Sequence, residues 1–171
     1  MRHWTLPAAI GAAILISGSG SATPAQGEVS GNYVLDQKRS DDAFQAIESG
    51  IAGLSNATRQ LARMKLRKSI AVNRMRISIA GNRVGITYDD KAPIVLWIGE
   101  DPVKWKLIEV LPFDVSAKAD GDAISLTFRG EDSERIMTYR SVGQDLVAVT
   151  TMTSPWLSKP VVYKQIFDRT L

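Results

Sequence analysis

Hydrophobic and polar residues alternate with a period of two over most of the chain from Ser69 onward. Residues 75–79 and 84–88 each place a hydrophobic side chain at every second position, and Gly81-Asn82 between them signals a tight turn. This arrangement is typical of a β-hairpin with one buried face. The same alternation, divided by turn-forming residues, predicts further strands at 93–99, 104–110, 113–119, 123–129, 135–141, 146–153 and 161–169.

The preceding segment has the period of an α-helix. Its hydrophobic residues are three or four positions apart for the most part, at Phe44, Ile47, Ile51, Leu54, Leu61 and Met64. Ser40 is expected to cap the first helix, with Asp41 and Asp42 in the first turn, where the helix dipole favours acids. Because two glycines and Ser55-Asn56 interrupt the middle, the pattern predicts two short helices joined by a turn.

One more strand precedes the helices. In Gly31–Asp36 the alternation puts Tyr33 and Leu35 on one face. With it, the pattern gives about ten strands, and the short loops between consecutive strands require antiparallel neighbours. We therefore expect a mainly β fold: a ten-stranded antiparallel meander closed into a barrel or clam, with a helix-turn-helix inserted between strands 1 and 2. Residues 26–171 are expected to form this single barrel domain.

The first 25 residues have the order of a secretory signal peptide. Arg2 gives a positive start, the run from Leu6 to Ile16 is uncharged and mostly apolar, and small residues follow. The apolar run is shorter than the roughly 20 residues that a membrane-spanning helix needs. We therefore expect cleavage after Ala22 or Ala25, with Ala25 preferred, and an exported protein that is periplasmic or secreted.

Composition narrows the chemistry that the mature chain can perform. The sequence has no Cys, and its one His, His3, lies in the expected signal peptide. These absences remove Ser-His-Asp and Cys-His nucleophilic systems, the usual zinc sites and haem ligation by His or Cys. We expect no enzymatic activity, no cofactor and no metal site. A hydrolase that works with carboxylates is the remaining catalytic alternative.

Positive charge is concentrated in one part of the chain. The net charge is +3, yet no acidic residue lies between Glu48 and Asp89. Arg59, Arg63 and Arg67 recur there every four residues and line one face of the second predicted helix. One interpretation is a solvated face; another is contact with an anionic membrane or an acidic ligand at the barrel mouth. Nucleic acid binding is disfavoured by the expected export and because no aromatic residues are interleaved with these charges.

The order of these elements resembles that of the intracellular fatty-acid-binding proteins, within the lipocalin-like group. The opening is similar to theirs: Gly31-x-Tyr33-x-Leu35, then Ser40-Asp41-Asp42 entering the helix, then Thr58-Arg59 ahead of the second strand. The resemblance implies a β-barrel that binds a small ligand in its interior. In that family the last strand carries an Arg-x-Tyr pair that clamps a carboxylate, and the nearest matching positions here, Gln165-Ile166-Phe167, lack the charge.

The chain also resembles a group of exported bacterial proteins, and this second resemblance implies no particular function. The similar segments are Val103-Lys-Trp105, Phe113-Asp-Val-Ser116, Thr151-x-Thr-Ser-Pro155 and Lys159-Pro160-x-x-Tyr163.

A ligand-binding barrel needs inward side chains that leave room, with few polar groups to orient the ligand. On the last strand Lys164 and Asp168 are expected to face water, which turns the alternate residues inward. Phe44 and Ile47 are expected to close the mouth from the helices. The candidate ligand-binding residues are Tyr33, Phe44, Ile47, Phe128, Tyr139, Tyr163, Gln165 and Phe167. The alternative is that these side chains fill a solid core.

The sequence therefore favours a non-enzymatic exported barrel that binds a small apolar or amphipathic molecule, with a basic helical cap near its mouth. The rival hypothesis is an interaction or inhibitor domain whose barrel is solid and whose loops or basic helix contact a protein or an envelope surface. The candidate surface-binding residues are Arg59, Arg63 and Arg67.

Overall fold

The described part of the chain is a ten-stranded antiparallel sheet with two helices between its first and second strands. The structure is a computed structural model that describes residues 29–70, 72–106 and 112–171, so the expected signal peptide lies outside the described residues. The elements are β1 (Gly31–Asp36), α2 (Ala43–Ile51), α3 (Asn56–Ile70), β2 (Arg74–Ala80), β3 (Arg83–Tyr88), β4 (Ile94–Trp97), β5 (Val103–Lys106), β6 (Pro112–Asp120), β7 (Ala123–Arg129), β8 (Glu134–Val142), β9 (Asp145–Thr153) and β10 (Val161–Thr170).

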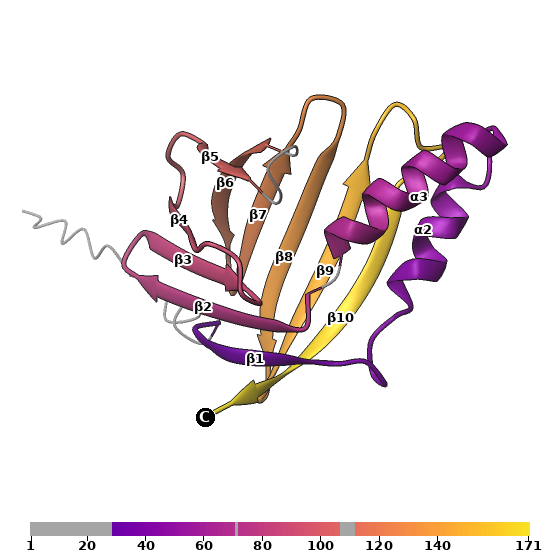
Figure 1. Ribbon diagram of the computed structural model, residues 1–171. Helices are drawn as coiled ribbons and strands as arrows, with labels where there is room; N and C mark the ends of the chain where they lie inside the picture. Colours follow the sequence, from indigo (N-terminus) through magenta and orange to yellow (C-terminus); the bar gives the residue numbers. More distant parts are fainter. Residues whose placement is uncertain (1–28, 71, 107–111) are drawn as a thin grey trace, which may run out of the picture.

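The sheet curls round to enclose one interior (Figure 1). Its strand order is β4-β3-β2-β1-β10-β9-β8-β7-β6-β5, and neighbouring strands are antiparallel. β1 pairs with both β2 and β10, so the first and last strands lie side by side. The prediction of a mainly β, ten-stranded antiparallel barrel with helices between strands 1 and 2 is confirmed.

β4 and β5 are the two ends of this strand order, and a few specific contacts join the two edges. Trp105 on β5 donates its indole Nε1–H to the carbonyl oxygen of Ala92, just before β4, at 3.3 Å. The backbone N–H of Gly99 donates to the carbonyl oxygen of Ala117 at 3.0 Å, next to an isolated parallel bridge between Ile98 and Ala117. The closure of the barrel therefore depends on Trp105 and on the segment that follows β4.

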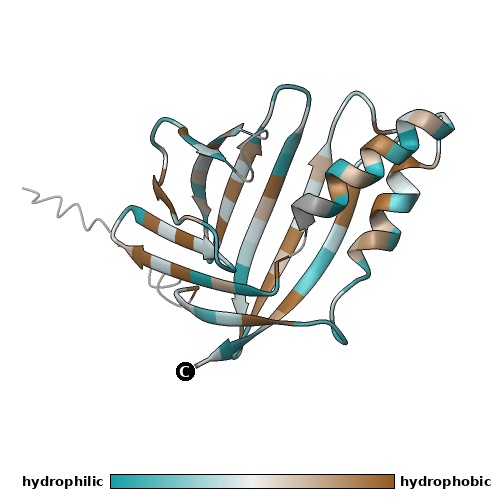
Figure 2. Ribbon diagram, viewed as in Figure 1, coloured by the Kyte–Doolittle hydropathy of each residue, from teal (hydrophilic) through white to brown (hydrophobic). Residues whose placement is uncertain are grey.

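Most strands bury every second side chain, as the pleat of a sheet requires. Figure 2 shows the result as alternating hydrophobic and hydrophilic bands along the strands. On β10 the buried residues are Val161, Tyr163, Gln165 and Phe167, whereas Lys164 and Asp168 are exposed, as predicted. The predicted strand at 104–110 corresponds to β5, and residues 107–111 lie outside the described residues.

The entry into α2 differs from the prediction. Asp42, not Ser40, is the N-cap, and its side chain accepts hydrogen bonds from two backbone N–H groups of the first turn. Ser40 Oγ instead accepts from the backbone N–H of Ile166 at 2.9 Å, and Asp41 accepts from that of Lys164 at 2.7 Å. Ser40 and Asp41 thus continue the hydrogen bonding of β10 beyond the end of β1, which removes both from the helix.

The two helices lie together beside the end of β9 and the start of β10 (Figure 1), and we call this the cap end of the barrel. A separate hydrophobic cluster lies beneath them. We call it the cap cluster; its buried residues are Ile47, Ile51, Met152, Val161 and Tyr163. The larger barrel core is made by buried side chains of all ten strands and of Val29. The buried hydrophobic residues of the described chain therefore form two clusters.

Gly50 allows α2 to approach β10 closely. A Cβ atom built at this position would lie 2.3 Å from Cγ2 of Val161, which is closer than real side chains approach. The glycine that weakens the helix in sequence terms therefore has a packing role at the cap end.

The predicted helix-turn-helix is confirmed, but the hydrophobic residues that gave its second helix a helical period are not the ones it buries. Leu61 and Met64 are exposed, whereas Ala62 and Leu66 pack against the cap cluster. The spacing of Leu61 and Met64 indicates a helix whether these residues are buried or exposed. Periodicity alone therefore could not show which face of α3 is buried. Among the described residues, neither helix is long and apolar enough to cross a membrane.

Candidate functional site

Polar groups gather inside the barrel where the barrel core meets the cap cluster. We call them the polar belt; its members are Tyr88, Tyr139, Thr150, Tyr163 and Gln165. Tyr163 lies opposite Thr150 in the β9–β10 register, and Gln165 and Tyr139 lie on either side of Ala148. A buried polar group costs roughly 1–3 kcal/mol unless it is hydrogen-bonded. Each member of the polar belt therefore needs a partner within the interior.

Two members of the polar belt meet across the barrel. The hydroxyl groups of Tyr88 on β3 and Tyr139 on β8 are 2.6 Å apart, and either can be the donor. The Tyr139 hydroxyl also lies 3.4 Å from the sulfur atom of Met137. Burial raises the pKa of both phenols, so both are neutral at physiological pH. Side chains therefore fill the barrel interior between Tyr88 and Tyr139.

Thr150 contributes a hydroxyl group with no hydrogen-bond partner of ordinary geometry among the described residues. The residue is fully buried on β9. Its Oγ1 lies close enough to the Tyr163 phenol to lower the pKa of that group, against the larger effect of burial, which raises it. The polar belt thus contains a buried hydroxyl with unused hydrogen-bonding capacity.

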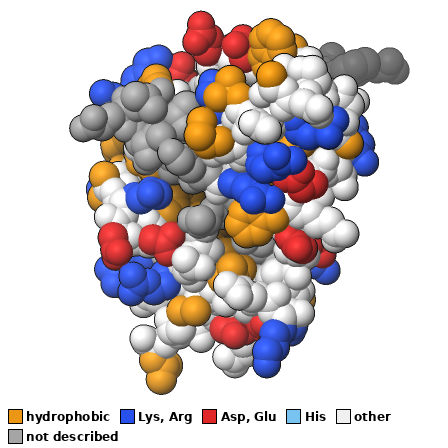
Figure 3. All heavy atoms as spheres, turned by 45° about the vertical axis from the view of Figure 1, so that its right-hand side comes forward, with side chains coloured by type: hydrophobic (Ala, Val, Ile, Leu, Met, Phe, Trp, Pro, Cys, Tyr) orange, Lys and Arg blue, Asp and Glu red, His pale blue; other side chains and the backbone are white. Residues whose placement is uncertain are grey.

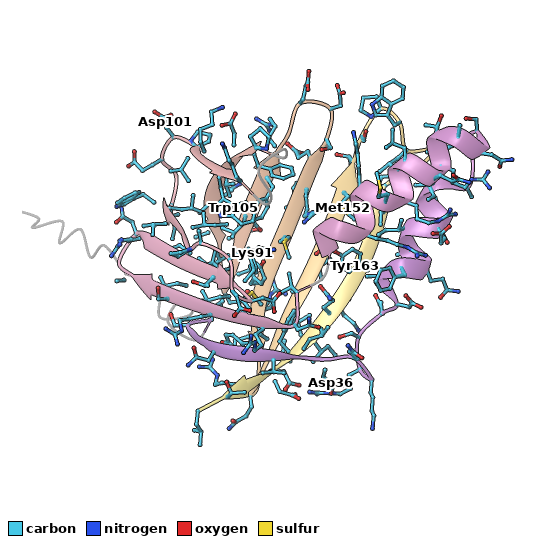
Figure 4. The ribbon with its side chains drawn as sticks, in the orientation of Figure 1. Asp36, Lys91, Asp101, Trp105, Met152 and Tyr163 are labelled. Carbon is cyan, nitrogen blue, oxygen red and sulfur yellow. The ribbon has the colours of Figure 1, made fainter. Side chains whose placement is uncertain are left out.

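Arg135 places a positive charge on the interior face of β8. Burial patterns along the strand put Arg135 on the same side as Met137 and Tyr139, and its direct partners across the sheet are Phe128 and Met152. Burial lowers the pKa of the guanidinium, and the nearby Tyr163, Tyr88 and Tyr139 act in the opposite direction. Met152 and Tyr163 are labelled on β9 and β10 near α3 in Figure 4.

An aromatic cluster lies next to Arg135 on the β5 side. Phe128 packs against Trp105 with ring centroids 5.9 Å apart, and against Phe113 at 6.3 Å in a T-shaped arrangement. Tyr88 completes the cluster, 6.4 Å from both Trp105 and Phe128. Phe128 and Met152 are 4% and 3% exposed, whereas Phe113 and Arg135 are half-buried. The side chains of Arg135 and Phe113 are therefore less completely buried than those of Phe128 and Met152.

Several solved structures share the architecture of this chain. A REP1-NXSQ fatty acid transporter matches with a TM-score of 0.56 and 16% identity, over 84% of this chain and 97% of that one. The fatty-acid-binding protein from Manduca sexta gives 0.56 and 16%, over 82% and 98%. The chain has the fold of the fatty-acid-binding proteins. A secretory abundant heat soluble protein from Ramazzottius varieornatus shares it, with a TM-score of 0.58 and 12% identity over 84% and 96%. No protein-family model and no curated protein matches the sequence.

Within this fatty-acid-binding-protein fold, most predicted ligand-binding residues are buried, but they do not form one group. Tyr163, Gln165 and Tyr139 belong to the polar belt, and Ile47 to the cap cluster. Phe128 lies in the barrel core, as do Tyr33 and Phe167, which approach the other end of β10. Tyr33 has a partner already: its hydroxyl donates to the carbonyl oxygen of Val29 at 2.9 Å.

Phe44 was predicted wrongly as a residue that closes the mouth. Its side chain is 47% exposed, and the guanidinium of Arg67 lies over its ring at 5.1 Å. The reason is the first turn of α2: with Asp42 as N-cap, Ile47 and Ile51 face the barrel. In the first turn of α2 it is Ala43, and not Phe44, that packs against the cap cluster.

Arg135 was not among the residues that the sequence analysis placed inside the barrel. The signal was present, since Tyr139 was assigned to the interior and Arg135 has the same parity on the same strand. At the positions of the usual carboxylate clamp, Gln165 and Phe167 are buried and uncharged. In the described part of this chain, a cation therefore lies on the interior face of β8, whereas the interior positions of β10 at the clamp site are uncharged.

The three predicted surface-binding arginines of α3 make contacts within the helical pair. Arg63 donates from Nε and Nη2 to the two carboxylate oxygens of Glu48, both at 2.6 Å, and Arg67 donates to Glu48 at 3.1 Å. These contacts lower the pKa of the Glu48 carboxyl, chiefly through its hydrogen bonds with Arg63. Arg59 donates to the carbonyl oxygens of Ala52 and Leu54 in the turn. The arginine face of α3 is thus directed towards α2.

The solvent side of α3 carries apolar residues instead. Leu61 and Met64 are 50% and 51% exposed, next to the exposed Lys65. Figure 3, in which the helix side is turned forward, shows Lys and Arg side chains interleaved with hydrophobic ones on this face. Cations and exposed apolar groups thus share the solvent side of α3, whereas the predicted arginine face is directed towards α2.

A surface pocket of about 280 Å³ lies along β1, β2, β3 and the end of β10. Its lining includes the exposed Arg74 and Arg76 and the carboxyl groups of Asp89 and Asp90. Asp89 accepts from the backbone N–H groups of Asn73 and Arg74, at 3.1 and 2.8 Å, so it fixes the start of β2. The pocket is explained by this local structure and is not part of the polar belt.

Proposed function

We propose that this protein binds a small apolar or amphipathic molecule inside the barrel, at the cap end. The fold is shared with proteins whose names describe fatty acid transport and binding. The observation that carries the proposal is the polar belt between the barrel core and the cap cluster. Convergent polar groups with perturbed pKa values in an apolar interior are typical of a ligand site, and the phenols of Tyr88, Tyr139 and Tyr163 are such groups.

The presence of two separate clusters suggests how a ligand could reach the polar belt. Moving the helices away would disrupt the cap cluster, which involves Ile47, Ile51 and Val161, but would leave the barrel core in place. A small cluster is the less stable of the two, because local opening costs less where few apolar contacts are lost. The cap end is therefore the proposed entrance.

The rival function is that of an interaction or inhibitor domain with a solid barrel. It is favoured by the close packing at the level of Tyr88 and Tyr139, which are 4% and 0% exposed and bonded to each other. In that case the polar belt only fixes the packing of the core, and partners contact the outer surface.

Native mass spectrometry of the purified protein separates these two functions. A co-purified lipid, or a saturable complex with an added fatty acid, supports the binding barrel. A clean unliganded mass that stays unchanged after incubation with fatty acids and fatty alcohols overturns it and supports the solid-barrel function.

Export is also proposed, on the signal-like order of residues 1–25. The mature N-terminus is expected at or near Gln26, and N-terminal sequencing of protein recovered outside the cytoplasm tests it. A soluble cytosolic form that retains Met1 contradicts export.

An anionic membrane surface is proposed as a partner of the helical cap. No acidic residue follows Glu48 until Asp89, and the exposed Leu61 and Met64 stand beside Lys65. Cationic and apolar groups on one helix favour binding to the interface of an anionic bilayer. We propose a binding role, and no catalytic one, for the barrel itself.

A further inference from the structure

The outer side of β1–β4, which faces away from the barrel core, carries cations without matching acids. Arg74 and Arg76 of β2 and Arg83 of β3 are exposed there. Arg74 pairs with Asp90 at 3.2 Å, whereas Arg76 and Arg83 make no ion pair within the described part of the chain. This face therefore presents two guanidinium groups that are available to an anion.

Arg76 belongs to the surface pocket of about 280 Å³ described above. Asp89 explains how this pocket forms, and its other side chains determine what it can bind. The register aligns four outward residues of the pocket in one row across the sheet: Thr87, Arg76, Asn32 and Thr170. Arg76 Nε donates to Asn32 Oδ1 at 2.8 Å, which holds the guanidinium in this row and uses only one of its five N–H donors.

The pocket offers hydrogen-bond acceptors as well as donors. The hydroxyl groups of Thr87 and Thr170 both donate and accept, and the side chain of Asp90 is 93% exposed although it pairs with Arg74. A ligand rich in hydroxyl groups needs this mixture, because each of its hydroxyls also donates and accepts. The unpaired guanidinium of Arg76 adds a preference for a carboxylate. An acidic sugar meets both requirements.

An exposed aromatic side chain lies further along the same face. Trp97 on β4 is 45% exposed and pairs with Arg83 in the β3–β4 register. The flat face of an indole ring is electron-rich, so it attracts the polarised C–H groups of a pyranose ring. A sugar stacked on Trp97 would thus lie beside the second free cation of this face.

Gly85 leaves the path between the pocket and Trp97 without a side chain. It is the outward residue of β3 between Thr87 and Arg83. A Cβ atom built there would lie 2.7 Å from Oγ of Ser78, so the backbone is open only because the residue is glycine. Four residues of strand separate Thr87 from Arg83, a span of about 13 Å. This span is longer than one sugar ring, so a ligand that occupies both ends is an oligosaccharide.

We propose that the outer face of β1–β4 binds an acidic oligosaccharide, with one sugar stacked on Trp97 and the carboxylate of another held by Arg76. This site lies outside the barrel and does not depend on the ligand proposed for the interior. A nucleic acid, another extended polyanion, fits less well, because it stacks successive bases on several aromatic side chains. Trp97 is the one exposed aromatic residue that the structure describes on these four strands.

The test is calorimetric binding of tetragalacturonate and of its methyl ester, which share a sugar chain and differ in charge. The wild-type protein is expected to prefer the acid by about tenfold or more, the effect of a hydrogen-bonded charge pair. Arg76→Gln is expected to lose this preference, and Trp97→Ala to weaken the binding of both probes by about tenfold. Lys118→Gln and Trp156→Ala are the matched controls and should bind as the wild type does, because Lys118 is exposed on β6 and Trp156 is 60% exposed in the β9–β10 loop.

All four substitutions replace exposed side chains, so the variants are expected to fold, and circular dichroism checks this. No binding of tetragalacturonate by the wild type, or equal binding of the acid and the ester, overturns the proposal. A loss in Lys118→Gln equal to that in Arg76→Gln also overturns it, because it would show a general attraction of charge. Binding of the tetranucleotide of thymidine as tight as that of tetragalacturonate would assign the face to a nucleic acid instead. None of these results changes the test of the interior ligand by native mass spectrometry.

A second measurement locates the site without a variant. The backbone and indole N–H signals of protein labelled with nitrogen-15 are followed by NMR during titration with tetragalacturonate. The signals of Thr87, Gly85 and Trp97 are expected to shift, whereas those of Thr150 and Tyr163 in the interior stay in place. Shifts confined to the interior or to the two helices overturn the proposed site.

Discussion

The hydroxyl groups of Tyr88 and Tyr139 lie 2.6 Å apart inside the barrel, although 51 positions separate the two residues in the chain. Tyr88 ends β3 and Tyr139 lies in β8, strands that are not neighbours in the sheet. The hydrogen bond therefore connects two sides of the barrel through its interior. Both hydroxyls are buried, so the loss of one leaves the other without its best partner.

Replacing either tyrosine by phenylalanine is expected to destabilise the fold by about 1–2 kcal/mol, the cost of a buried hydroxyl left unsatisfied. The double variant Tyr88→Phe/Tyr139→Phe is expected to cost less than the sum of the two single variants, because no orphaned hydroxyl remains. Urea unfolding of the four proteins measures this coupling. Strict additivity would mean that water or another group replaces the missing partner.

All four tyrosines of the chain are expected to resist alkaline titration. Burial raises the pKa of Tyr33, Tyr88, Tyr139 and Tyr163 above the ordinary value of 10.0. Because the folded state holds these protons more tightly, its stability is complete below pH 10 and falls as the pH rises above it.

Tyrosinate absorbance is therefore expected to appear well above pH 10, in step with the loss of the β-sheet circular dichroism. Free tyrosine in the same buffer is the reference. A tyrosinate signal with its midpoint at 10 in a protein that keeps its circular dichroism would show that water reaches these phenols.

The strands of this barrel could be predicted from sequence more reliably than its helices, and the reason is physical. On β10 a strict period of two assigns each side chain to one face, so the inward Tyr163, Gln165 and Phe167 followed from the exposed Lys164. On α3 the predicted stripe of Leu61 and Met64 competes with another, Ala62 and Leu66, one position along. Which stripe is buried depends on packing against the cap cluster, whose Met152, Val161 and Tyr163 lie far along the chain, and no local pattern contains that contact.

The candidate site was predictable only in part. Period-two alternation placed Tyr139 and Tyr163 inside, and the same rule applied to Arg135 would have found the interior charge. The pairing of Tyr88 with Tyr139 was not predictable, because it depends on the curvature of the closed sheet and not on local pattern. Ser40 was misassigned as a cap because its hydroxyl group accepts a hydrogen bond from Ile166 on β10, which lies 126 positions later in the chain.

Gly50 provides a test of how closely the cap is packed. Alanine is favoured over glycine within a helix by about 1 kcal/mol, so Gly50→Ala would stabilise α2 if space allowed. The added Cβ would lie 2.3 Å from Val161, a stiff β-branched residue on β10. Overpacking of this kind costs about 1–3 kcal/mol, so the net expectation is a loss of stability.

Thermal unfolding of Gly50→Ala measures this loss, and Gly53→Ala is the matched control. At Gly53 the nearest atom to an added Cβ is the Cβ of Ser158, at 3.2 Å, in a loop instead of a strand. Gly53→Ala is expected to be the less harmful of the two. The stability lost through Gly50→Ala should be smaller in a Val161→Ala background than in the wild-type protein. A stabilising Gly50→Ala would contradict the close approach of α2 and β10.

The proposed membrane contact of the cap is tested by co-sedimentation with vesicles of phosphatidylglycerol and phosphatidylcholine. Exposed apolar residues, and not the paired arginines, are expected to dominate. The double change Leu61→Gln/Met64→Gln should weaken binding by about tenfold, because partial insertion of two apolar side chains contributes at least 1.4 kcal/mol. Val142→Gln is the control, since Val142 is 54% exposed but lies at the β8–β9 turn.

The contribution of charge to vesicle binding is measured by its dependence on salt and by a second pair of variants. The Debye length falls from roughly 10 Å at 0.1 M to about 3 Å at 1 M, so attraction to the anionic surface should fade over this range. Lys65→Gln is expected to weaken binding more than Arg63→Gln, because Arg63 already donates two hydrogen bonds to Glu48 at 2.6 Å. A larger effect of Arg63→Gln in a protein that remains folded would mean that the arginines leave Glu48 for the membrane. Binding that does not respond to salt, or no binding by the wild type, would rule out the anionic membrane as a partner and assign the exposed face of α3 to solvent.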